Sequence, residues 1–205
     1  KLPGVTVLGV NFDAATGELH SMNYHWPDLI DHVNYTVVGG DGRVTKNLAI
    51  PVPDMPMMHD MSLTTKYAIV YDLPVTVNMN VLVAGYSFPF KWDPDRAARV
   101  GLLPRAGTAD DIIWCDVDPC YVFHIANAYQ DADGRVIVDC AVYETMFADG
   151  PDGLNGKSMG FERWSIDTQT RKVERRTIDA EAQEFPRPDE RRFGQEYRYA
   201  WAIGI

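Results

Sequence analysis

Residues 121–143 read YVFHIANAYQDADGRVIVDCAVY, and this stretch decides the fold class. Residues 121–128 and 135–143 are rich in β-branched and aromatic residues, which favour strands. Between them, DADG at residues 131–134 is a turn sequence, because aspartate and glycine suit the backbone angles of tight turns. The stretch therefore predicts an antiparallel hairpin.

The pattern of strand, Asp/Gly-containing turn and strand recurs along the chain. Residues 112–117 are predicted to pair with residues 121–128. No helical stripe of a dozen residues stands out; residues 75–83 fit either a strand or a helix, and residues 94–100 fit a short helical turn. The other predicted strands are residues 5–11, 18–24, 34–38, 43–50, 66–72, 161–166 and 172–178.

Many short strands separated by turns predict a sandwich, a barrel or a propeller. The repeated hairpin form favours a propeller, whose blades are antiparallel four-stranded sheets. About a dozen strands make about three such blades, too few to close a ring. We therefore expect residues 1–205 to form one all-β unit that is part of a propeller.

Composition excludes some functions. The chain has 205 residues and a formal charge of -10, which argues against nucleic acid, because binding to phosphates rests on lysine and arginine. No run of about 20 apolar residues predicts a membrane span. The three cysteines lack a CxxC pair, so reduced thiols in a cytoplasmic protein are expected. Lys1, in place of a methionine, indicates a segment or a processed product.

Two of the five histidines have distinctive surroundings. His20, His25 and His32 lie in polar, turn-rich sequence and are interpreted as surface or hydrogen-bonded core residues. His59 shortly precedes a predicted strand, and His124 lies within an apolar one. A histidine among apolar neighbours needs hydrogen-bond partners or a metal. These two cannot share a hairpin but could meet at a propeller axis, so the pattern leaves both interpretations open.

Several short motifs occur in order along nearly the whole chain. The segments MHDMSLT (58–64) and FHIANAY (123–129) resemble the surroundings of two iron-binding histidines in the carotenoid cleavage oxygenase family. The supporting segments are YDLP (71–74), FPFKWDP (88–94), RVG (99–101), LPR (103–105), RWSID (163–167), EFPR (184–187) and YRYA (197–200).

The resemblance implies a seven-bladed propeller with Fe(II) on its axis, held by four histidines. Such enzymes split an alkene with O₂ into two carbonyl products, in carotenoids, apocarotenoids or hydroxystilbenes. It implies that His59 and His124 are iron ligands and that Glu184 orients His124. The expected partners are O₂ and a small apolar or phenolic alkene, with peripheral membrane contact left open.

The chain also departs from the family pattern. The family's first iron histidine shortly precedes a turn that here reads DAATGEL (13–19), so its position falls at or near Gly9. The fourth histidine would follow Ile205, and the blades that usually contact the substrate would precede the chain. We therefore expect this chain alone to bind iron poorly and to cleave nothing, and we expect no rescue by Gly9→His alone.

Two alternatives remain at this level. The chain could be a metal-free, degenerate propeller that serves as a binding or structural domain, or a different metal could occupy the surviving histidines. The sequence does not identify the substrate. If His59 and His124 are both ligands, their rings should lie side by side at one axial point.

Overall fold

The computed structural model describes residues 5–25, 31–86, 88–150 and 156–205, which form almost entirely β-structure. The first half contains β1 (Val5–Asp13), β2 (Glu18–His25), β3 (His32–Val38), β4 (Val44–Pro51), β5 (Ser62–Leu63), β6 (Tyr67–Asp72), β7 (Val75–Val77) and β8 (Phe90–Trp92). The second half contains β9 (Ala98–Pro104), β10 (Ile113–Val117), β11 (Ile125–Gln130), β12 (Val136–Tyr143), β13 (Ser158–Ile166), β14 (Val173–Asp179), β15 (Gln183–Pro188) and β16 (Ala200–Gly204). The described part has one α-helix, α1 (Met79–Val83), and two 3-10 turns, Ala109–Asp111 and Glu190–Arg192.

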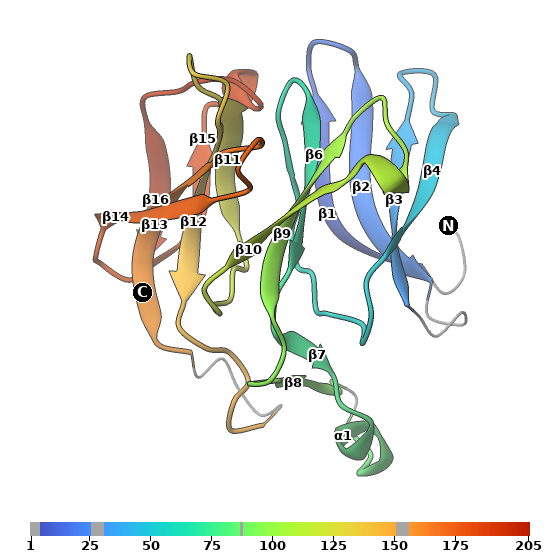
Figure 1. Cartoon of the computed structure of the whole chain (residues 1–205), viewed down its shortest axis with the longest axis vertical. Coiled ribbons are helices and arrows are strands. Elements are labelled where there is room, and N and C mark those ends of the chain that lie inside the picture. The colour runs from blue at the N-terminus through green and yellow to red at the C-terminus, as the bar shows by residue number, and fades with distance from the viewer. Residues whose placement is uncertain (1–4, 26–30, 87, 151–155) are drawn as a thin grey trace.

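Three antiparallel four-stranded sheets stand side by side (Figure 1). The first is β1-β2-β3-β4, the second is β5-β6-β9-β10, and the third is β11-β12-β13-β14. In each sheet the strands follow one another from one edge to the other, which is the form of a propeller blade. A two-stranded sheet, β15-β16, follows the third blade, and β7, β8 and α1 form an excursion between β6 and β9. The predicted all-β propeller segment is confirmed.

The hairpin predicted from residues 121–143 is present as β11 and β12. Its turn contains Gly134 in the left-handed region, at φ 83°. The Asp131 side chain stabilises the turn by accepting from the backbone N–H of Asp133 at 3.0 Å and of Arg135 at 2.9 Å. The first strand begins later than predicted, because Tyr121 makes only an isolated bridge to Tyr143.

Two local predictions were wrong. Residues 112–117 do not pair with residues 121–128: β10 pairs with β9, and β11 pairs with β12. The intervening residues carry the chain from the outer edge of the second blade to the inner edge of the third, so sequence neighbours belong to different sheets. Residues 94–100 do not form a helical turn either. A turn follows Asp93, and β9 then pairs along its whole length with β6.

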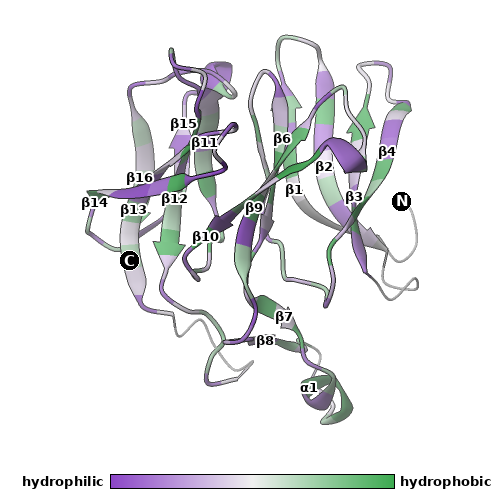
Figure 2. Cartoon of the chain, viewed as in Figure 1, coloured by the Kyte–Doolittle hydropathy of each residue, from purple (hydrophilic) through white to green (hydrophobic). Residues whose placement is uncertain are grey.

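The second blade is buried on both faces, because it lies between the other two. In β6, Ile69 and Tyr71 pack toward the third blade, whereas Ala68 and Val70 pack toward the first. Side chains on a strand alternate between its faces, so a strand with two buried faces is apolar throughout. The strand β4, on the outer edge of the first blade, is mostly exposed. In Figure 2, which is coloured by hydropathy, β4 carries a purple, hydrophilic stretch beside its green residues.

The first strand of each sheet lies on the inner side of the structure. Contacts join β1 to β5, β5 to β11, and β11 to β15. The segments that enter these strands are therefore brought to one place although they are far apart in sequence. No helix in the described residues has the length and apolar character needed to cross a bilayer.

Candidate metal site

His59 and His124 meet where the inner strands converge. His59 precedes β5, and His124 immediately precedes β11. Their ring centroids are 5.0 Å apart and their planes are perpendicular, at 89°. Both line one pocket, together with residues of β1, β5, β11 and β15. The expected convergence of the two rings is therefore observed.

Neither ring is buried in the core, although the apolar sequence around His124 suggested burial. His59 is exposed toward the pocket, and the His124 side chain is 27% exposed. Aromatic packing positions the rings: Phe123 contacts His59 edge-on, at 5.2 Å between centroids. Phe185 packs against His124 at 4.6 Å. Both histidines thus line the pocket and can be reached from it.

Glu184, the first residue of EFPR, contacts His124 as the resemblance implied. Its Oε2 atom lies 2.7 Å from His124 Nδ1 and also accepts from the backbone N–H of Phe185 at 3.0 Å. Glu184 is buried, and Phe185 has φ 55° within a bulge of β15. The bulge re-aims the strand so that the carboxylate reaches the imidazole. Because Nδ1 is engaged, Nε2 is the atom of His124 left for a metal.

Electrostatics favour neutral imidazole at His59. The protein around this ring removes part of its hydration although the ring faces the pocket, and this desolvation lowers the pKa of His59; the neighbouring His124 lowers it further. A lowered pKa keeps the ring unprotonated at neutral pH, which is the form that ligates metals. The Glu184 carboxylate also acts on Tyr143, whose pKa is raised, first by burial and then by Glu184.

Asp60 is a residue that the sequence analysis did not single out. Its Oδ1 atom accepts from the Met61 N–H at 2.8 Å, and its Oδ2 atom accepts from the Ile125 N–H at 3.2 Å. Burial raises the pKa of this carboxyl. The sequence feature that could have identified Asp60 is its place directly after His59, within the motif that indicates the site.

Gly9 lies in the pocket wall, in a bulged part of β1. A Cβ atom added to Gly9 would lie 2.5 Å from the Met61 nitrogen and 2.9 Å from the Asp60 carbonyl carbon. The backbone of β1 is therefore packed directly on the Asp60–Met61 peptide, and Asn11 Nδ2 donates to Met61 O at 2.9 Å. At the position expected for the first ligand, the chain has neither a donor side chain nor room for one.

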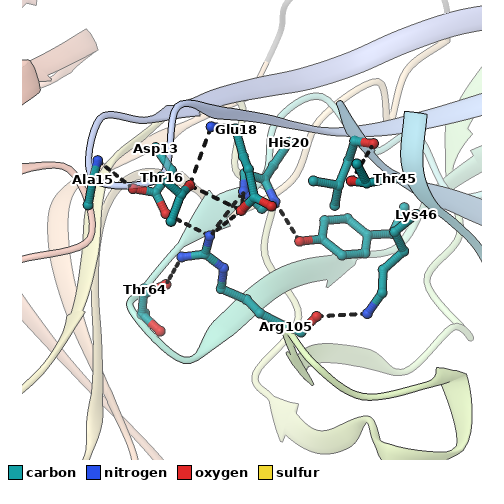
Figure 3. Close-up of polar contacts among 11 residues, drawn as sticks. Asp13, Ala15, Thr16, Glu18, His20, Thr45, Lys46, Thr64 and Arg105 are labelled. Atoms are coloured by element: carbon teal, nitrogen blue, oxygen red, sulfur yellow. Dashed lines mark hydrogen bonds and ion pairs between the residues drawn. The ribbon is translucent and has the colours of Figure 1, made fainter. Parts of the chain in front are cut away.

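A second group with metal-binding composition, Asp13, Glu18 and His20, already holds a cation. The Arg105 guanidinium lies 2.6 Å from Asp13 Oδ2, 3.1 Å from Glu18 Oε2 and 3.1 Å from His20 Nε2 (Figure 3). These ion pairs link Arg105, at the end of β9 in the second blade, to the first blade. His20 is buried, and its Nδ1 atom lies 2.6 Å from the Tyr35 hydroxyl, so it is a hydrogen-bonded core histidine.

The remaining candidates have other roles. His32 lies near the surface, with Nδ1 3.1 Å from Asp31, and the side chain of His25 lies outside the described part of the chain. Cys115, Cys120 and Cys140 are free and buried.

Comparisons with known proteins agree with the motifs. The family model described as retinal pigment epithelial membrane protein matches residues 10–205. A carotenoid cleavage oxygenase of Mycobacterium tuberculosis is 34% identical, over 94% of this chain and 47% of that protein. Resveratrol cleavage oxygenase 1 of Chaetomium globosum is 27% identical, over 92% of this chain and 38% of that protein.

A solved structure, that of the lignostilbene dioxygenase of Pseudomonas brassicacearum, matches with a TM-score of 0.85 and 27% identity. It covers 98% of this chain and 44% of that one. The chain therefore belongs to the carotenoid cleavage oxygenase family, the family of the retinal pigment epithelial membrane protein. It spans less than half the length of these relatives.

Proposed function

We propose that this chain is the part of an Fe(II)-dependent dioxygenase that supplies two of the metal's histidine ligands, His59 and His124. The whole protein would cleave a carbon–carbon double bond of a carotenoid, an apocarotenoid or a hydroxystilbene with O₂. The carrying observation is the perpendicular pair of imidazoles, 5.0 Å apart, one of which is bound through Nδ1 to the buried Glu184.

The donor set fits such a metal in kind but is incomplete in number. Two neutral imidazoles suit a divalent transition metal, and a carboxylate behind one ring fixes its orientation and raises its basicity. Gly9 contributes no donor, and the further histidine ligands that the family pattern implies would come from other parts of the whole protein. When bound, Fe(II) would supply the oxygen chemistry. The chain's own part would be to hold His124 by Glu184, to keep His59 neutral, and to shape one side of the pocket.

The substrate class rests on two features. The relatives named above are described as acting on carotenoids, resveratrol or lignostilbenes, all of which contain alkenes. The excursion around α1 exposes Met79, Leu82, Val83 and Tyr86. An exposed apolar segment favours contact with a lipid surface or an apolar substrate. We propose O₂ and an apolar or phenolic alkene as partners.

The competing function is a metal-free propeller that serves as a binding or structural domain. The close packing of Gly9 on the Asp60–Met61 peptide favours it, because a backbone contact occupies the place where the family pattern would put a ligand. A different metal at the same two histidines is the third candidate. The three candidate functions predict different metal binding, so titration with metal ions separates them.

The test is anaerobic titration of the purified chain with Fe(II) and, separately, with Co(II) and Zn(II). With only two imidazoles, we expect weak but saturable Fe(II) binding and no cleavage of a stilbene or an apocarotenoid. His59→Asn and His124→Asn should each abolish the binding, whereas His32→Asn, at a surface histidine, should leave it unchanged.

The outcomes are distinct. Binding that survives both His59→Asn and His124→Asn would show that the metal is held elsewhere, and the proposal fails. The metal-free alternative holds if none of the ions binds. Retention of Zn(II) with no Fe(II) binding would favour the third candidate. Near-stoichiometric Fe(II) with O₂-dependent cleavage would show that this chain carries further ligands.

A further inference from the structure

Asp60 connects the two histidine-bearing segments. Met61, whose N–H donates to Asp60 Oδ1 at 2.8 Å, is two residues after His59. Ile125, whose N–H donates to Oδ2 at 3.2 Å, is the residue after His124. One carboxylate thus spans 65 positions of sequence and joins the second blade to the third beside the paired rings.

The same short segment is held from the opposite side by the first blade. Asn11 donates to Met61 O at 2.9 Å, and the β1 backbone at Gly9 packs on the Asp60–Met61 peptide. The Asp60–Met61 segment therefore cannot shift toward either neighbour without breaking a hydrogen bond or creating a clash. Its position determines where His59 lies relative to His124.

We propose that Asp60 is a positioning residue that fixes the separation of the two imidazoles. This role requires a carboxylate, because one side chain must accept hydrogen bonds from two backbone N–H groups, one on each oxygen. The asparagine amide offers one acceptor oxygen, and its NH₂ group would face an N–H donor. Asp60→Asn therefore keeps the size of the side chain but loses one of the two links.

Only the predicted change in metal affinity rests on the proposed function. The geometric statement concerns the two segments and can be tested without a metal. The closing experiment therefore measures ring proximity and amide protection first and metal affinity second. In this way failure of the positioning role is distinguished from failure of the proposed function.

The experiment compares the wild-type chain with Asp60→Asn and with the control Asp139→Asn. Asp139 is a fully buried carboxylate in β12 that accepts from Arg163 at 2.8 Å and from Tyr197 at 2.7 Å, and it does not line the pocket. The control should therefore disturb the fold at least as much while leaving the histidine pair intact. Each protein is studied by NMR and by Co(II) titration.

In the wild type and in Asp139→Asn, we expect cross-relaxation between ring protons of His59 and His124 and slow exchange of the Ile125 amide. In Asp60→Asn, we expect the cross-relaxation to be lost and the Ile125 amide to exchange faster than in the control. Co(II) affinity should fall by about 10–100-fold in Asp60→Asn, as when other residues that orient metal ligands are lost. Asp139→Asn should retain wild-type affinity.

The inference is overturned if Asp60→Asn keeps the ring contacts, or if its effects equal those of Asp139→Asn. It is also overturned if the wild-type Ile125 amide exchanges like that of an unprotected peptide, a measurement that stands even if the variant does not fold. Ring proximity that depends on Asp60 in a chain that binds no Co(II) or Fe(II) would support the inference and refute the proposed function.

Discussion

Replacing Gly9 by alanine tests whether this position, where the family pattern would put a ligand, is a packing contact. The added Cβ would lie 2.5 Å from the Met61 nitrogen and 2.9 Å from the Asp60 carbonyl carbon, whereas ordinary contact begins near 3.4 Å. The overlaps are thus 3.4 − 2.5 = 0.9 Å and 3.4 − 2.9 = 0.5 Å. The Cβ would also lie 2.8 Å from the Asp60 Oδ1 atom, but the other two partners are backbone atoms, so no side-chain rotation relieves the clash with them. The β1 strand must move away from the second blade.

That movement has a cost that can be estimated. Overpacking typically costs about 1–3 kcal/mol. A longer distance between Asn11 and Met61 O, now 2.9 Å, removes a hydrogen bond worth about 0.5–1.5 kcal/mol. We expect Gly9→Ala to lower the free energy of unfolding by about 2–4 kcal/mol, and Tm by about 4–16 °C at roughly 2–4 °C per kcal/mol for a chain of this size.

The assay is urea denaturation followed by circular dichroism, with Gly204→Ala as the control. Gly204 lies in β16, and a Cβ there would meet nothing within 4 Å. The control should stay within about 0.5 kcal/mol of the wild type. If Gly9→Ala is equally neutral, with an unchanged dependence on urea, then β1 moves aside freely and the close packing is no obstacle to a histidine. Gly9→His should be less stable still and should not gain metal affinity.

Three further predictions follow from contacts at and around the site. Glu184→Gln should weaken metal binding by about 10–100-fold in Co(II) titration while leaving the fold intact, and unchanged affinity would count against its orienting role. Arg105→Met should lower the free energy of unfolding by about 2–4 kcal/mol, because Asp13 and Glu18 lose their cation, whereas Arg43→Met, at an exposed pair, should cost less than about 1 kcal/mol. Equal losses in these two variants would contradict the role of Arg105. Burial and Arg105 lower the pKa of His20, so the unfolded chain takes up this proton first as the pH falls below 6.5. Stability should thus be complete above that pH and decline as the pH falls toward the lowered pKa. His20→Gln should flatten this slope in urea denaturation between pH 8 and pH 5, and an unchanged slope would refute the assignment.

The sequence predicted those features that depend on local pattern and on motif order. The turn at residues 131–134 and its two strands could be read from residue types alone. The meeting of His59 and His124 could be expected because the inner strands of successive blades converge, and the resemblance pointed to Glu184.

Other features depend on contacts between segments that no local pattern reveals. The pairing of β9 with β6 joins segments that the excursion of β7, α1 and β8 separates in sequence. The partner of β10 is β9, which precedes it in sequence, and this hairpin was missed because residues 94–100 were interpreted as a helical turn. The bridging role of Asp60 requires knowing that Ile125 N–H lies across the blade boundary. The contact of the buried His20 with Arg105, 85 residues away, and the pairing of Arg105 with the two nearby carboxylates also lie beyond local pattern.

The absence of a histidine at position 9 and the bridge made by Asp60 are two aspects of one packing arrangement. A side chain at position 9 would need the space that the Asp60–Met61 peptide now occupies. That peptide is in turn drawn toward β11 by the Asp60 carboxylate and toward β1 by Asn11. Restoring a third imidazole therefore requires more than one substitution. The Asp60–Met61 peptide would have to retreat from β1, which would strain the link that sets the separation of His59 from His124. An attempt to rebuild the site should combine Gly9→His with a change that releases Met61 from Asn11. Cross-relaxation between the rings of His59 and His124 will show whether the second blade keeps its position in such a double variant.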